Sequence, residues 1–535
     1  MATTTVNGVT PTEEKKVIFA SSLGTVFEWY DFYLYATLAP FFAALFFPKG
    51  NATAALLSAF AAYAAGFLVR PFGAIIFGRI GDLVGRKYTF LVTILFMGGA
   101  TFLVGLLPTY ESIGWLAPIL LVTLRLVQGL ALGGEYGGAA TYVAEHAPHG
   151  KRGYDTSWIQ TTATLGFFLS LLVIGICRFG GVMTPAEFAS WGWRIPFLVS
   201  LVLLIFSIYI RLKLNESPVF QRMKAEGRGS KSPLTDSFLR YPNNKYVLLA
   251  LLGATAGQGV VWYTGQFYAL FFLTITLKVD GQTAYTLIAL ALLLGTPFFI
   301  VFGALSDKIG RLKIILAGCL IAALTYFPLF KALTHFVNPA LETFATANPI
   351  QVQAKDCNFH IFVGPWSNFT DCDRAKDFLT KSGLSFTSTT LPADAKDNVV
   401  MKIGPTEVKG WNEANVKKAL ADLKYPATAD KNAINWPMTL LILFIMMIYV
   451  TMVYGPIAAF LVELFPTRIR YTSMSLPYHI GNGWFGGMLP LLATAMVAAS
   501  GDIYYGLWYP IIVALMTVVV GALFLRDNKE QDINT

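Results

Sequence analysis

Three acidic residues stand inside long apolar stretches of the sequence, where charged side chains are rare. Glu28 and Asp31 lie in the run that begins near Val17, and Glu135 lies in a later run. A spacing of three residues places Glu28 and Asp31 on one face of a helix. A charge in an apolar interior is costly, so each residue is a candidate for function. We predict that all three carry protons; the alternative is that they neutralise a buried arginine permanently.

Two arginines in other apolar runs, Arg70 and Arg125, are suited to binding anionic groups. A guanidinium holds a carboxylate through two parallel hydrogen bonds, which fits either an anionic substrate or a structural ion pair. Amides and aromatic rings in later runs could bind a ligand, although at helical spacing they are also typical of packing. The predicted substrate-binding set is Arg70, Arg125, Gln128, Tyr263, Gln266 and Tyr454, and Gln258, Trp262, His479 and Asn482 are further candidates.

A short motif of glycine, aspartate and arginine occurs twice in the chain. Residues 78–87 read Gly-Arg-Ile-Gly-Asp-Leu-Val-Gly-Arg-Lys, and residues 303–313 read Gly-Ala-Leu-Ser-Asp-Lys-Ile-Gly-Arg-Leu-Lys. Glycine permits a tight turn and a close approach of helices, and we expect Asp82 to cap the following helix and to pair with Arg86. Two copies at corresponding positions favour a latch that closes and releases on a rocking motion.

A second pair of segments extends this latch. Glu145-His-Ala-Pro followed by Arg152 matches Glu463-Leu-Phe-Pro followed by Arg468. The predicted cytoplasmic gate consists of Gly78, Asp82, Gly85, Arg86, Glu145, Arg152, Gly303, Asp307, Gly310, Arg311, Glu463 and Arg468.

The composition excludes most other classes of protein. Of 535 residues, 55% are hydrophobic, 14% are aromatic and only 13% are charged, and the mean hydropathy is +0.57. A soluble globular protein carries about 25% charged residues. The five histidines have no metal-binding spacing, and neither a phosphate-binding loop nor a catalytic pair is found. We therefore expect no enzyme, no cofactor and no metal site.

Apolar runs long enough to cross a bilayer identify a polytopic membrane protein. A helix needs about 20 residues to cross roughly 30 Å of hydrocarbon. Twelve such runs begin near Val17, Ala54, Tyr88, Trp115, Thr156, Trp193, Tyr246, Ala284, Leu312, Pro437, Thr472 and Tyr504.

The basic residues orient these spans and account for the net charge of +9. Lysine and arginine are retained on the cytoplasmic side of membrane proteins. Here they gather in alternate connections, including the stretch 211–245, which holds eight Lys/Arg and three Asp/Glu. We predict that both termini are cytoplasmic and that this charge marks the cytoplasmic side of a protein embedded in the lipid bilayer; we expect no nucleic-acid partner.

The repeated motifs divide the chain into two halves and one insertion. We predict an all-α polytopic membrane protein with twelve transmembrane helices in two pseudo-symmetric six-helix bundles, plus a small extracytoplasmic α+β insertion. The predicted parts are the first bundle at 1–210, a cytoplasmic loop at 211–245, the second bundle at 246–336 and 437–526, the insertion at 337–436 and a cytoplasmic tail at 527–535.

The insertion has the pattern of a small folded module. Its two cysteines, Cys357 and Cys372, could form a disulfide in an oxidising compartment, and closing such a loop stabilises a fold by roughly 3 kcal/mol. Unpaired thiols in a simple spacer are the alternative. The sequence predicts strands at 359–363 and 399–403 and helices at 373–381 and 413–423.

These motifs together resemble the major facilitator superfamily. Residues 125–135, 191–197 and 463–473, together with the segment Glu28-Trp-Tyr-Asp31-Phe, are similar to the metabolite:proton symporter family within it. That family includes bacterial carriers of 2-oxoglutarate, citrate, shikimate and proline/betaine. The resemblance covers the chain outside the insertion.

The resemblance implies a secondary active transporter of the bacterial inner membrane. Such a protein would import a small organic acid, for example a di- or tricarboxylate, by proton symport through alternating access, and would work as a monomer on a small-molecule substrate and protons. Uptake of a zwitterion is an alternative, because carriers of zwitterions also have an Arg-Pro pair like that at Arg70. A membrane sensor that uses the external insertion is the alternative from another class.

Overall fold

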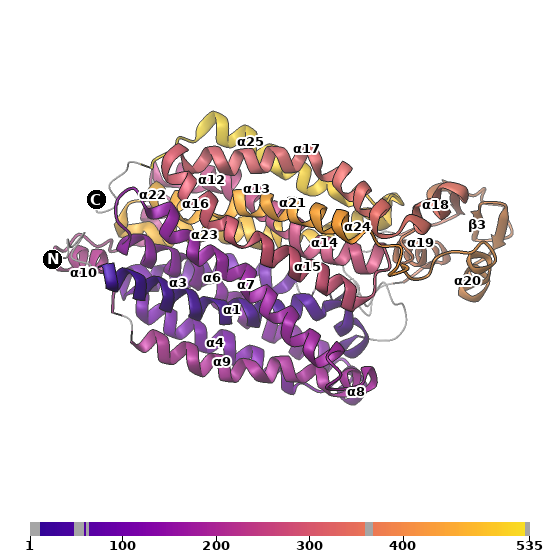
Figure 1. Cartoon of the computed structure of the whole chain (residues 1–535), viewed down its shortest axis with the longest axis horizontal. Helices are drawn as coiled ribbons and strands as arrows, with labels where there is room; N and C mark the ends of the chain where they lie inside the picture. Colours follow the sequence, from indigo (N-terminus) through magenta and orange to yellow (C-terminus); the bar gives the residue numbers. More distant parts are fainter. Residues whose placement is uncertain are drawn as a thin grey trace.

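The computed structural model describes residues 11–47, 58–59, 62, 64–213, 215–358 and 368–529. Long helices run side by side in two halves, and a small domain of helices and strands projects from one end of this body (Figure 1). The first long helix starts and the last long helix ends at the opposite end of the body (Figure 1). We call these two ends the insertion end and the termini end.

The first half consists of long helices that cross the body and short helices at their ends. The first helix, α1, packs against α7 and α9, and α6 packs against α3 and α4. The elements of this half are α1 (Pro11–Phe46), α3 (Arg70–Leu83), α4 (Arg86–Leu106), α5 (Tyr110–Ile113), α6 (Leu116–His146), α7 (Arg152–Phe179), α8 (Pro185–Ser190), η1 (Gly192–Arg194) and α9 (Ile195–Leu212). A connector with α10 (Pro218–Ala225) and α11 (Pro233–Phe238) leads to the second half.

Two spans of the second half are interrupted by π-helical turns, a feature that is frequent at functional sites. The first span consists of α12 (Asn243–Ala250), η2 (Leu251–Thr255), α13 (Ala256–Tyr263), η3 (Thr264–Tyr268), α14 (Ala269–Phe271) and η4 (Phe272–Thr276), of which η2, η3 and η4 are π-helical. The second consists of η5 (Thr467–Ile469), α23 (Arg470–His479), the π-helical η6 (Ile480–Gly486) and α24 (Leu489–Ser500). The other helices are α15 (Gly281–Gly295), α16 (Pro297–Ile309), α17 (Arg311–Val337), α21 (Trp436–Tyr454), α22 (Ile457–Leu464), η7 (Tyr505–Leu507) and α25 (Trp508–Phe524).

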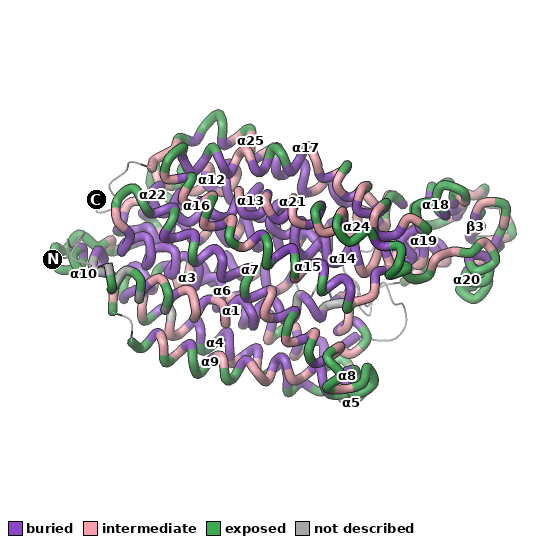
Figure 2. Tube along the Cα trace, viewed as in Figure 1, coloured by how far each residue is buried: buried purple, intermediate pink, exposed green. Residues whose placement is uncertain are grey.

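The helical body turns apolar side chains outward as well as inward. Phe206, Leu324 and Val519 are 55%, 67% and 56% exposed, respectively. Buried residues concentrate in the interior, whereas exposed residues follow the outer surface (Figure 2). Within the described ranges, eleven helices are long and apolar enough to cross a bilayer. An apolar outer surface on helices that satisfy their own backbone hydrogen bonds is suited to a lipid solvent.

These eleven helices correspond to eleven of the twelve predicted spans. They are Ala64–Leu83, Arg86–Leu106, Leu116–His146, Arg152–Phe179, Gly192–Leu212, Asn243–Thr276, Gly281–Ile309, Arg311–Val337, Trp436–Leu464, Thr467–Ser500 and Tyr505–Phe524. The predicted start of the second span, Ala54, lies outside the described residues. The remaining predicted span begins at Val17, which lies in α1, a single helix of 36 residues.

The insertion contains a mixed β-sheet flanked by helices. Among the described residues the sheet has four strands in the order β2-β1-β3-β4, with β1 parallel to β2 and antiparallel to β3. Buried and partly exposed residues alternate along β1, which places one face of the sheet in the core. The elements are α18 (Pro339–Ala347), β1 (Ile350–Ala354), α19 (Asp371–Lys381), β2 (Thr387–Thr390), β3 (Val399–Ile403), β4 (Thr406–Lys409) and α20 (Glu413–Asp422).

The insertion differs from the sequence prediction in its strands. The strand expected at 359–363 lies outside the described residues, and the first strand is β1. The sequence did not predict β2 and β4, because both strands are short and largely exposed. A disulfide between Cys357 and Cys372 ties the loop after β1 to the start of α19.

The insertion is fastened to the second half. The Phe386 amide donates to the Gly501 carbonyl at 2.7 Å, and the Ala429 amide donates to the Lys278 carbonyl at 2.9 Å. The Lys278 ammonium in turn donates to the carbonyl of Lys381. These contacts hold the insertion to the ends of η4 and α24 in the second half.

Candidate substrate and proton sites between the two halves

Arg70 begins α3 and is fully buried where the two halves meet. Its guanidinium carbon lies 4.3 Å from the ring centroid of Phe32 and 4.0 Å from that of Phe67. Gly483 of the second half packs against its side chain. Within the described residues Nε, Nη1 and Nη2 have no hydrogen-bond acceptor in good geometry, and Tyr263 interacts with the guanidinium electrostatically. Buried guanidinium groups normally have hydrogen-bond acceptors. The unsatisfied donors of Arg70 are therefore available to an anionic ligand.

Other buried polar atoms close to Arg70 also lack partners. Both ring nitrogens of His479 and the indole nitrogen of Trp262 make no hydrogen bond to the part of the chain that the structure describes. His479 lies within electrostatic range of Arg70, and the Trp262 ring packs 4.9 Å from that of Tyr263. Proteins satisfy roughly 90% or more of their buried polar groups. Several unsatisfied groups gathered at one place therefore indicate a site for a polar ligand.

Aromatic rings from both halves form a wall beside these groups. Tyr33 of α1 stacks on Trp262 of α13 with ring centroids 5.6 Å apart, and Tyr136 of α6 stacks on Tyr478 of α23 at 3.5 Å. The hydroxyl groups of Tyr454 and Tyr478 are hydrogen-bonded at 2.7 Å. Such a wall can enclose an apolar or a cationic part of a ligand.

Three of the predicted substrate residues are buried but contact other protein groups. Arg125 Nη1 donates to Gln128 Oε1 at 2.6 Å, and Gln128 Nε2 donates to Thr101 Oγ1 at 2.7 Å, so this chain lies inside the first half. Gln266 Nε2 lies 4.0 Å from Met447 Sδ. The structure therefore brings Arg70, Tyr263 and Tyr454 to the interface, and places Gln128 behind it.

Two amides join the spans that contain the π-turns. Gln258 Nε2 donates to Asn482 Oδ1 at 2.9 Å, and Asn482 Nδ2 donates to Gln258 Oε1 at 2.8 Å. Each amide thus satisfies the other. We therefore expect Gln258 and Asn482 to hold the two spans together beside the site and not to contact a ligand directly.

Glu28 and Glu135 share one arginine, which the sequence analysis did not single out. Arg211, in the last turn of α9, pairs through Nη2 with Glu28 Oε1 and, at 2.9 Å, with Glu135 Oε1. All three side chains are at most 4% exposed. Two carboxylates facing one guanidinium carry one excess negative charge when both are ionised. Arg211 stands at the start of the basic connector, so its sequence position suggested a loop residue.

Asp31 lies three residues from Glu28 but has different surroundings. It is only 4% exposed, and its Oδ1 atom has no hydrogen-bond partner among the described residues. No lysine, arginine or histidine of the described ranges forms an ion pair with it. A buried carboxyl group without a cation needs a proton or a mobile ion as its counter-charge. Of the three predicted proton carriers, Asp31 is the one that has no ion pair with a cation in the part of the chain that the structure describes.

At the termini end, four buried residues form the Glu145 cluster: Asp82, Arg86, Glu145 and Arg470. Arg86 Nη1 lies 3.2 Å from Asp82 Oδ1, and Arg86 Nη2 lies 3.8 Å from Glu145 Oε1. Arg470 Nη1 lies 3.1 Å from Glu145 Oε1. Arg470 belongs to α23 in the second half, and the other three residues belong to the first half. The Arg470–Glu145 ion pair therefore joins the two halves.

The Glu463 cluster repeats this arrangement with the roles of the halves exchanged. It consists of Arg152, Asp307, Arg311 and Glu463. Arg311 Nη2 lies 2.9 Å from Asp307 Oδ1 and 2.9 Å from Glu463 Oε1, all within the second half. Arg152 of the first half lies 3.5 Å from Glu463 Oε1. The two clusters therefore close the termini end with pseudo-symmetric ion pairs.

Each motif aspartate also caps a helix of the opposite half. Asp82 Oδ2 accepts hydrogen bonds from the Thr472 amide at 2.9 Å and the Thr472 hydroxyl at 2.7 Å, near the start of α23. Asp307 accepts from the Gly153 and Tyr154 amides, both at 2.9 Å, at the start of α7. The prediction that Asp82 caps the following helix is wrong, although its pairing with Arg86 is present. An acidic group at a helix N-terminus is stabilised there by the unpaired amides.

Other acids cap the helices that follow the motifs. Glu216 Oε2 accepts from the Lys87 amide at 3.2 Å at the start of α4. Asp527 Oδ2 accepts from the Leu312 amide at 2.9 Å at the start of α17. Neither of these caps joins the first half to the second half.

The motif glycines are needed for backbone conformation and close approach. Gly85 and Gly310 have φ angles of +147° and +111°, which side chains rarely allow. A Cβ atom at Gly78 would lie 3.1 Å from a backbone Cα of α23, and one at Gly303 would lie 2.6 Å from the Gly153 carbonyl oxygen. Helices of the two halves therefore meet at these glycines.

Arg468 belongs to neither cluster, contrary to the sequence prediction. It is exposed and lines a pocket beside the connector, whereas Arg470, two residues later, is buried against Glu145. Arg468 lies in η5 and Arg470 begins α23, and residues two apart in a helical segment do not share a face.

Comparisons with known proteins agree with this architecture. Residues 16–237 match the family described as sugar (and other) transporter. The chain is 37% identical over 334 residues to the shikimate transporter of Escherichia coli (strain K12), covering 60% of this chain and 72% of the relative. It is 36% identical over 322 residues to the alpha-ketoglutarate permease of that organism, with 60% and 72% covered. It is 38% identical over 317 residues to the "Putative proline/betaine transporter" of Staphylococcus aureus (strain MSSA476), with 58% and 66% covered.

The same fold is found among solved structures. The proton:xylose symporter XylE bound to 6-bromo-6-deoxy-D-glucose matches with a TM-score of 0.63 at 14% sequence identity, covering 98% of each chain. The relatives are named as transporters, so this chain is a transporter and not an enzyme. With its membrane-spanning helices, its repeated motif and these relatives, the chain belongs to the metabolite transporters of the major facilitator superfamily.

Proposed function

We propose that this transporter imports a small organic acid together with protons. The observation that carries the proposal is Arg70, a buried guanidinium between the halves. Among the described residues its three nitrogens have no hydrogen-bond acceptor in good geometry, and the Tyr263 hydroxyl interacts with the group. An uncompensated buried cation costs several kcal/mol. A substrate carboxylate offsets this cost through two parallel charged hydrogen bonds. The shikimate and alpha-ketoglutarate relatives are named for organic acids, which fits such a substrate.

A zwitterion with a carboxylate is the second candidate substrate. The aromatic wall around Trp262 and Tyr33 could hold a quaternary ammonium group by cation–π attraction while the carboxylate binds Arg70. The proline/betaine relative supports this reading by its name. Both candidates share the contact between a carboxylate and Arg70.

Asp31 is the first proton carrier of this proposal, because no cation of the described residues forms an ion pair with it. Glu28 and Glu135 form a second proton site, because both carboxylates pair with Arg211 and one bound proton neutralises their excess negative charge. A proton that enters either site changes the charge of the first half by one. That change couples proton binding to movement of the halves.

The two halves would rock about the Arg70 site in alternating access. The Glu145 and Glu463 clusters close the termini end, whereas a cavity of about 430 Å³ lies between the halves toward the insertion end. Arg178 and Tyr285 line that cavity from opposite halves. An arginine at the entrance attracts anions.

In the proposed orientation the termini end is cytoplasmic and the insertion is periplasmic. The basic connector then faces the cytoplasm, as lysine and arginine usually do. We propose that α1 is the twelfth span and completes two six-helix bundles. The protein would work as a monomer in the bacterial inner membrane.

Uptake into proteoliposomes tests this function. An imposed inward proton gradient should drive accumulation of an organic acid or betaine from a labelled panel, and Arg70→Met should abolish binding as well as uptake. Arg178→Met serves as a matched control, since it removes an arginine from the entrance and should raise the KM without abolishing uptake. Absence of gradient-driven uptake for the whole panel, with ligand binding retained by the insertion, would favour the sensor alternative.

A further inference from the structure

A pocket at the termini end has no part in the transport site. It has a volume of about 460 Å³ and lies between the connector and the second half. Val219, Arg222 and Met223 of α10 and the loop 226–229 form one side, and residues 466–468 form the other. This is where Arg468, the arginine left out of the Glu463 cluster, lies.

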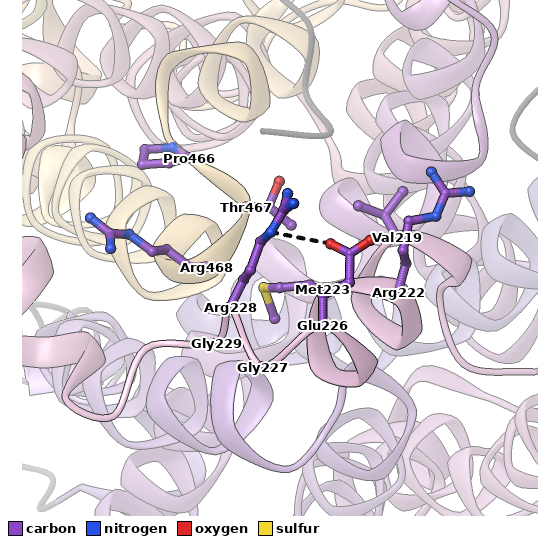
Figure 3. Close-up of a pocket in the computed structure, with 10 residues that line it drawn as sticks. All are labelled: Val219, Arg222, Met223, Glu226, Gly227, Arg228, Gly229, Pro466, Thr467 and Arg468. Atoms are coloured by element: carbon purple, nitrogen blue, oxygen red, sulfur yellow. Dashed lines mark ion pairs between the residues drawn. The ribbon is translucent and has the colours of Figure 1, made fainter.

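The charge of the lining is strongly basic. Three arginines, Arg222, Arg228 and Arg468, line the pocket together with one acid, Glu226. Arg228 lies in the middle of the pocket beside Thr467, and Arg222 and Arg468 project on opposite sides of it (Figure 3). Arginine binds phosphate groups through its planar set of donors. The lining thus selects an anion with several oxygen acceptors.

The one acid does not prevent such binding. Glu226 Oε2 lies 3.2 Å from Arg228 Nε, but these side chains are 42% and 70% exposed (Figure 3). An exposed pair of this kind contributes little stability, so an anion that makes two charged hydrogen bonds can replace it.

The pocket is also larger than a bare anion requires. Its volume lies within the range of sites for small organic ligands, roughly 300–1,000 Å³. Val219, Met223 and Pro466 supply an apolar part of the lining. These side chains would cover the organic portion of a phosphorylated compound while the arginines hold the phosphate.

We propose that this pocket binds a phosphate ester, supplied either by a soluble phosphorylated metabolite or by an anionic lipid headgroup. Residues 466–468 end two positions before Arg470, which pairs with Glu145 across the halves. A ligand held by the connector and by residues 466–468 together favours the state in which the termini end is closed. Anything that binds one state only shifts the equilibrium toward that state. The bound phosphate ester thus slows opening at this end, whatever substrate the protein carries.

Binding of sn-glycerol 3-phosphate to the purified protein, measured by calorimetry in detergent, tests the soluble source. Nanodiscs of phosphatidylglycerol, compared with phosphatidylcholine, test the lipid source through the melting temperature. Arg228→Ala and Arg468→Ala should each weaken the binding affinity about tenfold or more, because each removes a charged hydrogen-bonding group. Lys231→Ala, which removes a cation of the same connector outside the pocket, should leave it unchanged.

A filling variant separates a built pocket from general surface charge. Gly229 lines the pocket, and a Cβ atom there meets no atom within 4 Å. Gly229→Phe keeps every charge and should abolish binding, while Arg228→Lys should restore part of what Arg228→Ala loses. The proposal is overturned if neither probe binds wild-type protein, or if Gly229→Phe binds as well as wild type or Lys231→Ala weakens binding as much as Arg228→Ala.

Discussion

Replacing Asp82 and Asp307 by asparagine removes the charged caps that join the two halves at the termini end. Asp82 accepts two hydrogen bonds from Thr472, and Asp307 accepts two from the start of α7. These bonds exist only while the end is closed. The ion pairs of Asp82 with Arg86 and of Asp307 with Arg311 lie within one half and persist when it opens.

The size of the effect follows from these bonds. A hydrogen bond to a charged group contributes about 1.5–3 kcal/mol and a neutral one about 0.5–1.5 kcal/mol. Asparagine has one acceptor oxygen. At position 82 this oxygen can still accept both bonds from Thr472, because Oδ2 of Asp82 accepts both, so Asp82→Asn loses the difference twice, about 2–3 kcal/mol. At position 307 Oδ1 and Oδ2 each accept one amide, so Asp307→Asn loses one bond entirely and about 2.5–4.5 kcal/mol in total. We expect Asp82→Asn to raise the open population about 30- to 150-fold and Asp307→Asn to raise it about 60- to 1,500-fold. The double variant should approach the sum, because the two sites share no partner.

The assay is the labelling rate of a cysteine that is buried at the closed interface. Met474 is fully buried and accepts a hydrogen bond from Thr141 of the opposite half, so Met474→Cys is shielded until the end opens. The native thiols Cys177 and Cys319 are buried as well. A membrane-impermeant maleimide, supplied from the termini side, then reports the open population through its rate.

Two matched variants control for the loss of an acid. Glu216→Gln and Asp527→Asn remove caps that do not join the two halves, so their labelling rates should stay within about threefold of wild type, well under a 1.4 kcal/mol shift. Equal rates for Asp82→Asn and Glu216→Gln would refute the view that the motif aspartates act as a latch between the halves.

Three further predictions concern other parts of the molecule. Gly303→Val should prevent closure of the termini end, since a Cβ there would lie 2.6 Å from the Gly153 carbonyl oxygen; the same labelling should become fast, and normal labelling would contradict this. Cys372→Ser should lower the free energy of unfolding of the insertion by about 3 kcal/mol, measured by hydrogen exchange, while uptake is retained. Burial and the nearby charge of Lys381 lower the pKa of Lys278 to about 8 from 10.5, so docking of the insertion should strengthen between pH 8 and 10.5. Lys278→Met should lose that pH dependence of the melting temperature, and an unchanged profile would exclude Lys278 as its source.

The sequence alone predicted the spans well because length and hydropathy are local properties. The helix at Arg311–Val337 begins within one residue of the predicted start at Leu312. The turn at Gly85 was likewise foreseeable, because a glycine before a helix is a local signal. Local patterns also located α19 and β3 in the insertion.

Pairings between distant residues could not be derived in the same way. Arg468 and Arg470 both follow Glu463 in the same short segment, and only the path of η5 and α23 decides which of them is buried. Arg211 looked like a connector base, yet the end of α9 carries it into contact with Glu28. The strand β2 is stabilised by pairing with β1 and has no apolar face of its own to reveal it.

The most direct test of proton-coupled transport is a comparison of two assays on Asp31→Asn. Gradient-driven accumulation requires a proton site that loads and releases, whereas counterflow of labelled for unlabelled substrate requires only the substrate site and the rocking motion. We predict that Asp31→Asn loses accumulation and keeps counterflow at a rate near that of wild type. Accumulation retained at the wild-type level in Asp31→Asn would contradict the assignment of this buried acid as the proton carrier.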